Sequence, residues 1–93
     1  MSFSKEYLNE CIEICNRIDP EKIEKMASLI NSIRDNDGRI FFLGVGGGAG
    51  HAGHAVNDFR KICSIESYAP TDNVSELTAR VNDDGWDTSY VNW

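Results

Sequence analysis

The sequence predicts an α/β fold in which short parallel strands alternate with helices and two further helices come first. Apolar residues recur at helical spacing over residues 3–33, a short apolar run follows at Ile40–Leu43, and a glycine-dense turn joins that run to another helix. The order helix, helix, strand, helix, strand, helix is typical of parallel strands joined by right-handed crossovers.

A pair of helices is predicted over residues 1–37. The first covers residues 3–18, and the second begins after Asp19, which caps a helix whose first residue is Pro20. The polar stretch from Asp35 to Gly38 ends the second helix. The apolar stripes of the two helices consist of Tyr7, Leu8, Cys11, Ile12, Ile14, Cys15 and Ile18, then Ile23, Met26, Ala27, Ile30 and Ile33.

Residues 38–93 contain the predicted sheet. Ile40–Leu43 is a continuous apolar run bounded by glycines, which is typical of a parallel strand covered on both faces. The spacing of apolar residues then predicts a helix over Ala49–Ile62, and Cys63–Tyr68 has the character of a second short strand. Because two strands do not complete a parallel sheet, we expect this chain to be the first half of a longer protein.

Two more helical segments are predicted after the second strand. Asn73 and Glu76 have the spacing of a capping box, which predicts a short helix after a loop. Asp83 to Gly85 is predicted to form a turn, and the residues from Trp86 to Trp93 to begin another helix. These segments add no strand, so the predicted sheet keeps two.

Composition narrows the classes of function. The net charge of −6 disfavours binding to nucleic acid, because a nucleic-acid backbone is bound by clustered Lys and Arg. Three cysteines without the pattern of a small secreted domain favour a reducing compartment, so we expect a cytoplasmic protein. No apolar run approaches the roughly 18 residues of a membrane span, and no secretion signal is present, so we expect no membrane partner.

The glycine turn predicts a binding site for phosphate. Five glycines lie between Gly44 and Gly50, and their lack of Cβ atoms lets a ligand approach the backbone. The turn leads into a helix, whose first N–H groups can donate to an anion. A tight connection between strand and helix that binds no ligand is the alternative.

A dinucleotide site is a second alternative for the same turn. The residues from Gly48 to Gly53 satisfy the pattern G-x-G-x-x-G, and Glu66 lies at the predicted end of the next strand, where an acid that binds ribose is expected. Against this interpretation, the match begins several residues after the strand instead of directly at its end. No Lys-Ser or Lys-Thr pair follows, so the turn is not a Walker loop.

His54 and Asp58 are candidate metal ligands. They lie four residues apart on the predicted helix, so their side chains share one face and can converge on one atom. Imidazole and carboxylate both bind zinc, although a zinc site usually has three or four protein ligands. A surface ion pair is the alternative, and we expect His51, one turn earlier, to face the turn or solvent.

The glycine turn and the His54/Asp58 pair together resemble the sugar isomerase (SIS) domain, and within it the phosphoheptose isomerases. The resemblance runs from the second predicted helix to the end of the chain and is strongest over Gly44–Asp58 and Thr71–Gly85. The family's strand is followed by Gly-Asn-Gly-Gly-Ser. Three positions match, and Val45 and Gly48 replace the Asn and the Ser.

The resemblance implies a fold and a set of site residues. Residues 38–93 would be the first half of a SIS-type parallel-sheet sandwich with helices on both faces, and residues 1–37 would mediate assembly into a homotetramer. The matching positions imply His54 and Asp58 as zinc ligands, with Asp58, where the family has Glu, also the catalytic base. Substrate-binding residues would be Gly46, Gly47, Gly48 and Asp72.

The leading hypothesis for function follows from this resemblance. It is a cytoplasmic phosphoheptose isomerase, which interconverts sedoheptulose 7-phosphate and a heptose 7-phosphate for surface polysaccharide synthesis. The family's second half carries a further phosphate loop and a late His, so we expect this chain alone to be inactive. A noncatalytic SIS module that binds phosphosugars or docks onto another protein is the second hypothesis, and a dinucleotide-binding domain is the third.

Overall fold

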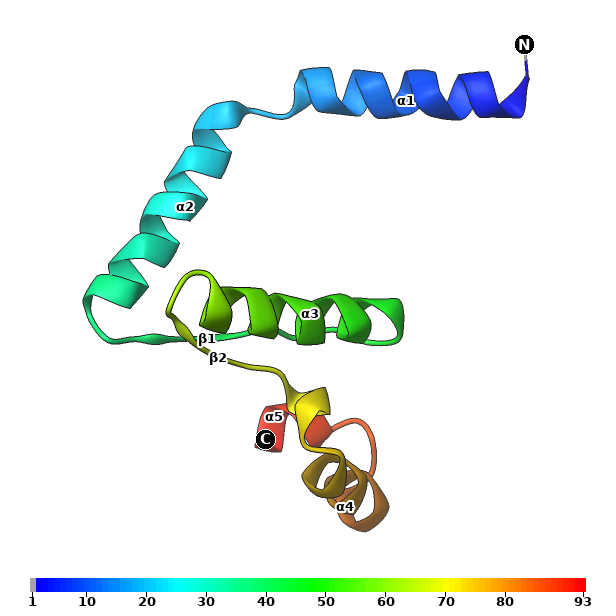
Figure 1. The fold of residues 1–93 in the computed structure, drawn as a ribbon. Helices are drawn as coiled ribbons and strands as arrows, with labels where there is room; N and C mark the ends of the chain where they lie inside the picture. Colours follow the sequence, from blue (N-terminus) through cyan, green and yellow to red (C-terminus); the bar gives the residue numbers. More distant parts are fainter. Residues whose placement is uncertain (1) are drawn as a thin grey trace. The chain divides into compact units, whose positions relative to one another are not determined.

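A computed structural model of the chain describes residues 2–93 (Figure 1). The chain forms two compact units that divide within the second helix, so that one ends at Ile30 and the other covers Asn31–Trp93. The sequence placed the boundary between residues 37 and 38, at the end of that helix. None of the helices in the described part of the chain has the length and apolar content needed to cross a membrane.

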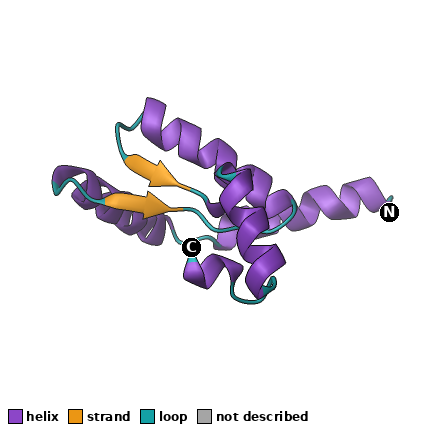
Figure 2. Cartoon of the chain, turned by 90° about the horizontal axis from the view of Figure 1, so that it is seen from below, coloured by secondary structure: helices purple, strands orange, loops and turns teal. Residues whose placement is uncertain are grey.

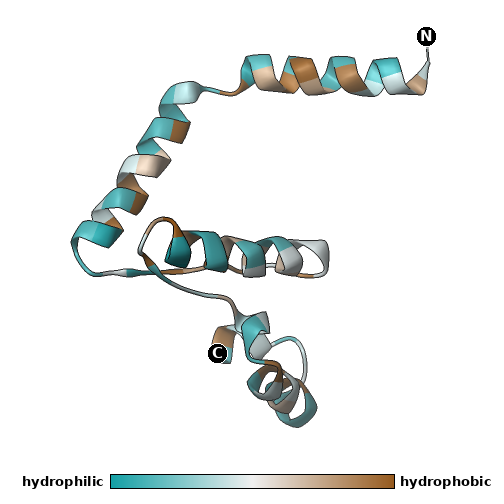
Figure 3. Ribbon diagram, viewed as in Figure 1, coloured by the Kyte–Doolittle hydropathy of each residue, from teal (hydrophilic) through white to brown (hydrophobic). Residues whose placement is uncertain are grey.

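The helical pair begins and ends close to the predicted positions. Helix α1 covers Phe3–Arg17 and α2 covers Pro20–Asp35. The Asp19 side chain accepts a hydrogen bond from the Glu21 amide at 3.0 Å, which supports the start of α2 as the sequence predicted. Neither helix has a buried residue, and apolar bands recur along both in Figure 3. Their large apolar side chains more than 45% exposed are Phe3, Tyr7, Leu8, Ile12, Ile14, Ile18, Ile23, Met26 and Leu29.

The second unit is built on a two-stranded parallel sheet. Strand β1 covers Arg39–Phe41, and β2, which covers Glu66–Tyr68, pairs with it so that Ile40 lies opposite Ser67. The two strands point the same way in Figure 2. Helix α3, Gly47–Lys61, connects them and runs alongside the sheet, as Figure 1 also shows. This arrangement confirms a mixed helix and strand fold.

The core lies between α3 and one face of the sheet. Ala52 and Val56 on α3 and Ala69 after β2 form a buried cluster, and Phe42 packs against it. The Phe42 and Phe59 rings lie 5.1 Å apart between centroids. Because the cluster is small, most of the apolar residues in the chain stay outside this core.

The expectation that the first strand is covered on both faces is wrong for the described chain. Side chains alternate between the two faces of a strand, so Phe41 and Leu43 lie opposite the α3 side, where they are 48% and 63% exposed. Phe41 stacks on Tyr68 and meets the edge of Trp93 on this second face. Within the described residues, α3 therefore covers one face, where Ile40 and Phe42 are half-buried, and the other face is left largely exposed.

The second strand is shorter than predicted. Ser64 has a φ of 56°, the left-handed region, and the Ile65 amide donates to the Phe59 carbonyl at 3.0 Å. Residues 63–65 therefore turn away from the end of α3 before β2 begins at Glu66. The pattern of apolar residues does not predict this turn, because a residue other than glycine rarely adopts a positive φ.

The last third of the chain is helical. A 3₁₀ turn, η1, covers Pro70–Asp72, and α4 covers Val74–Asp84. The predicted cap is confirmed, because the Asn73 side chain accepts from the Glu76 amide at 3.0 Å. The predicted turn at residues 83–85 is wrong for its first two residues, which are helical, and Gly85 ends α4 with a φ of 89°. The last predicted helix is reduced to α5, Ser89–Asn92.

Candidate functional site

Two glycines give the turn after β1 its shape. Gly46 is the N-cap of α3 and has φ 60° and ψ −124°, a conformation that is open to glycine and strained for other residues. Gly44 lies so close to the carbonyl group of Gly48 that an added Cβ atom would overlap it. These two positions require glycine for the fold itself.

Three further glycines have no such structural reason. A Cβ atom added at Gly47, Gly48 or Gly50 would meet nothing within 4 Å. All three lie in the first turn and a half of α3, where each glycine costs the helix about 1 kcal/mol relative to alanine. Within the described residues, no contact made by these glycines offsets this cost.

The amides at the start of α3 are only partly used. Gly48 donates to the Val45 carbonyl at 3.0 Å, and Ala49 and Gly50 both donate to the Gly46 carbonyl. Among the described residues, no acceptor faces the amides of Gly46 and Gly47. Gly46, Gly47 and Gly48 were predicted to bind substrate. The amides of Gly46 and Gly47 are therefore available as donors, whereas the Gly48 amide already donates within the turn.

An open hollow lies over this glycine face. It has a volume of about 410 Å³ and is lined by Gly47, Gly50, His51 and His54. These residues fall at i, i+3, i+4 and i+7, so a single face of α3 supplies the whole lining. His51 thus belongs to the hollow. Its spacing from Gly47 and His54 was the signal in the sequence that would have identified it.

His54 and Asp58 are close together on α3. Nε2 of His54 lies 3.2 Å from Oδ2 of Asp58, and the side chains are 78% and 49% exposed. The pair matches the surface ion pair that was the alternative to a metal site, and carries opposite charges only when the imidazole is protonated. Within residues 2–93, no three His, Cys, Asp or Glu side chains lie close enough to hold a metal ion together.

Asp72 lies on another side of α3. It belongs to η1, and its Oδ1 atom would be 3.6 Å from a Cβ atom added at Gly53. The element that approaches α3 at Gly53 is therefore η1. Asp72 is therefore beside the helix that carries His54, but it does not line the hollow.

The structure differs from a dinucleotide site in two respects. The G-x-G-x-x-G match at residues 48–53 lies inside α3, so its first glycine does not form the tight turn after the strand. The prediction that Glu66 ends the second strand is wrong, because Glu66 begins β2. It accepts a hydrogen bond from the Tyr68 hydroxyl at 2.7 Å, at the end of the sheet opposite the glycine turn.

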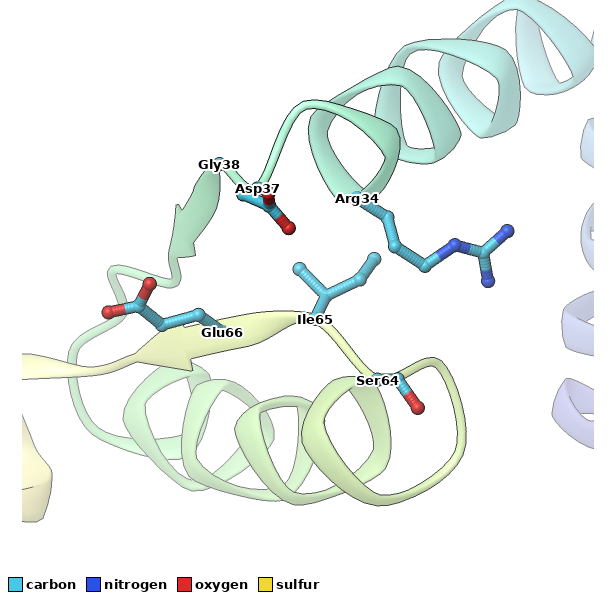
Figure 4. A pocket seen from close by; sticks show the side chains of 6 residues that line it. All are labelled: Arg34, Asp37, Gly38, Ser64, Ile65 and Glu66. Carbon is cyan, nitrogen blue, oxygen red and sulfur yellow. The ribbon is translucent and has the colours of Figure 1, made fainter.

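A smaller pocket lies at that opposite end (Figure 4). Its volume is about 190 Å³. The Arg34 guanidinium donates to Asn31 at 2.7 Å and to the Cys63 carbonyl at 3.4 Å. In Figure 4 the ends of Arg34 and Glu66 point away from each other, so the polar groups do not converge on a ligand. The residues that line this pocket are Arg34, Asp37, Gly38, Ser64, Ile65 and Glu66.

The structure thus gathers most of the predicted site residues on α3 and the turn before it. Gly47 and His54 line one hollow, and Gly46 and Gly48 are the chain neighbours of Gly47. Asp58 lies one turn beyond His54, and Asp72 lies to the side. Comparison of the chain with protein-family models, curated proteins and solved structures found no match in any of the three. Any assignment of function therefore depends on the chain's own residues.

Proposed function

We propose that this chain is the first half of a SIS-type phosphosugar isomerase, and that the turn before α3 binds the phosphate group of the substrate. The observation that carries the proposal is the open space above Gly47, Gly48 and Gly50. Glycines that destabilise a helix and contact nothing are explained if a ligand needs to lie against the backbone there.

The amides of Gly46 and Gly47 support a phosphate as that ligand. They are unpaired donors at the positive end of a helix of 15 residues, where an anion is stabilised by the helix dipole. No Lys or Arg lines the hollow, so backbone dipoles would provide the attraction in a chain whose net charge is −6.

His54 and Asp58 support an isomerase within this class. Two ligands at about 2.1 Å from one zinc ion in tetrahedral geometry lie roughly 3.4 Å apart, which is close to the 3.2 Å between His54 Nε2 and Asp58 Oδ2. The pair can therefore supply two of the ligands of a zinc ion, with the others coming from outside the described residues. A bound zinc ion would polarise the oxygens of the reacting carbons.

The proposed reaction is the interconversion of sedoheptulose 7-phosphate and a heptose 7-phosphate. In an aldose–ketose isomerisation, a base removes a proton from the hydroxyl-bearing carbon beside the carbonyl, which forms an enediolate. The proton then returns to the former carbonyl carbon, and a second proton passes from the hydroxyl oxygen to the former carbonyl oxygen. Asp58 is the proposed base, and its carboxylate is partly exposed on the helix that begins at the glycine turn. Asp72 is proposed to bind a hydroxyl group at the side of the site.

Calorimetry with two sugars tests the binding step. The chain should bind sedoheptulose 7-phosphate and should bind unphosphorylated sedoheptulose much more weakly, because only the first carries the group that the amides recognise. Equal affinity for the two sugars, or no binding of either, would contradict the proposal. For the complete protein, zinc-dependent conversion of sedoheptulose 7-phosphate is expected, and no turnover with zinc supplied would reject the enzyme.

A noncatalytic phosphosugar-binding module is the second candidate. One observation that favours it is the contact between His54 and Asp58, because the carboxylate of the proposed base is already paired with an imidazole. Another is Gly48, which lacks the hydroxyl group of the serine that the family has at this position. Gly48→Ser together with Asp58→Glu in the complete protein separates the candidates. An enzyme weakened by these departures gains turnover, whereas a binding module stays inert while it continues to bind the phosphosugar.

Location and assembly are also part of the proposal. Cys11, Cys15 and Cys63 are free thiols, which supports a reducing compartment such as the cytoplasm. The exposed apolar stripes of α1 and α2 support self-association, because apolar surface of this extent is normally covered in a protein. We propose that the two helices assemble copies of the chain into a homotetramer.

A further inference from the structure

Tyr90 connects the end of the chain to the glycine turn. Its hydroxyl donates a hydrogen bond of 2.7 Å to the Gly44 carbonyl, 46 positions earlier in the sequence. Tyr90 is partly buried and belongs to α5. This hydrogen bond joins a side chain of the C-terminal helix to the turn before α3.

The short helix α5 holds Tyr90 firmly in place. Ser89 is 1% exposed, and its hydroxyl donates to the Trp86 carbonyl at 2.8 Å. The rings of Trp86 and Tyr90 lie 5.5 Å apart between centroids. On the other side, Trp93 meets Phe41 of β1 at a ring distance of 5.5 Å. The Tyr90 hydroxyl therefore has a defined position relative to the end of β1.

Gly44 lies in the turn between β1, which ends at Phe41, and α3, which begins at Gly47. Its carbonyl belongs to the peptide group shared with Val45, so the direction of that carbonyl sets the path of the backbone toward Gly46 and Gly47. Glycine has no side chain to restrict its torsion angles, and close packing against Gly48 restrains only its α-carbon. The hydrogen bond from Tyr90 adds a restraint on the direction of the Gly44 carbonyl.

We infer that Tyr90 is a positioning residue for the ligand of the glycine turn. Its hydroxyl restrains the peptide group between Gly44 and Val45. That group leads into the two peptides that carry the Gly46 and Gly47 amides, whose own carbonyls accept from Gly48, Ala49 and Gly50, so the three peptide groups together set the orientation that receives a phosphate. The inference rests on the proposed phosphate site. It assigns the C-terminal helix a role in binding although no residue of α5 lines the hollow. Preorganised donors bind more tightly because less ordering is required on binding.

Tyr90→Phe tests this role, since it removes the hydroxyl and keeps the ring. The dissociation constant for sedoheptulose 7-phosphate should rise about three- to tenfold, the range expected for one hydrogen bond, and the weak binding of sedoheptulose should not change. In the NMR spectrum of the free protein, the amide resonances of Gly46 and Gly47 should move. A role confined to stability would lower the free energy of unfolding and leave the dissociation constant of the folded protein for sedoheptulose 7-phosphate unchanged.

Tyr68→Phe is the matched control. It removes a tyrosine hydroxyl that also forms a hydrogen bond of 2.7 Å, but to Glu66 at the far end of the sheet. This variant should bind sedoheptulose 7-phosphate as the wild type does. An equal loss of affinity in both variants would overturn the inference, because it would reflect general loosening of the sheet.

The outcomes separate this inference from the proposed function. If the wild type binds the phosphosugar and Tyr90→Phe binds it equally well, the role of Tyr90 is wrong and the phosphate site stands. If the wild type does not bind, both are overturned. If Tyr90→Phe does not fold, wild-type protein labelled with 3-fluorotyrosine provides the test. The ¹⁹F resonance of residue 90 should shift when sedoheptulose 7-phosphate is added and should not shift with sedoheptulose. An unchanged resonance with both sugars would overturn the inference.

Discussion

The α-carbon of Gly44 packs directly against the carbonyl group of Gly48, which brings the turn after β1 against the start of α3. The two residues enclose the turn, and the contact leaves no room for a side chain. Gly44→Ala should therefore destabilise the protein by about 3 kcal/mol or prevent folding, because the backbone would have to move. Urea unfolding measures the change, and an effect below about 1 kcal/mol would contradict the packing.

Gly50→Ala is expected to separate stability from binding. Because Gly50 is helical and its Cβ position is open, alanine should stabilise the protein by about 0.5–1 kcal/mol. The same methyl group would project into the hollow and should weaken binding of sedoheptulose 7-phosphate at least about tenfold. A variant that is more stable and binds as well as the wild type would show that the space over Gly50 is not used by the ligand.

His54→Ala should affect zinc binding far more than folding. The His54–Asp58 contact is exposed, so its loss should change the free energy of unfolding by less than about 0.5 kcal/mol. Zinc affinity should fall at least about tenfold, since a ligand is removed. Glu13→Ala is the control, because it breaks another exposed i,i+4 pair, with Arg17, and should leave zinc binding unchanged.

Ile14→Asp tests self-association through α1. Ile14 is 60% exposed on the apolar stripe, and a charge there should shift the protein toward smaller species. Asn16→Asp places the same charge on the opposite side of the helix and should leave the assembly intact. Sedimentation equilibrium compares the three proteins. A monomeric wild type would contradict the proposed tetramer.

Glu66→Gln should lower the pKa of Tyr68. The hydrogen bond from Tyr68 to Glu66 and the negative charge of that carboxylate raise the tyrosine pKa above its usual value of 10.0. A raised pKa in the folded state contributes stability below pH 10 that is lost as the pH rises through that pKa. NMR titration of the Tyr68 ring follows the change, and an identical titration in Glu66→Gln would contradict this cause.

The sequence alone determined the features that act over a few residues. Asp19 and Pro20 predicted the start of α2, and Asn73 with Glu76 predicted the cap of α4, because a cap is a bond between near neighbours. The glycine turn and the His54–Asp58 pair were likewise local patterns. The type and order of the elements followed from apolar spacing along each segment.

Only the tertiary structure decided how distant segments meet. It placed Glu66 at the start of its strand, left Phe41 on a half-exposed face, and joined Tyr90 to Gly44 across 46 positions. It also divided the glycines into those that the fold requires and those that leave space open. These outcomes depend on which backbone groups approach one another after folding, and no short-range preference in the sequence encodes that approach.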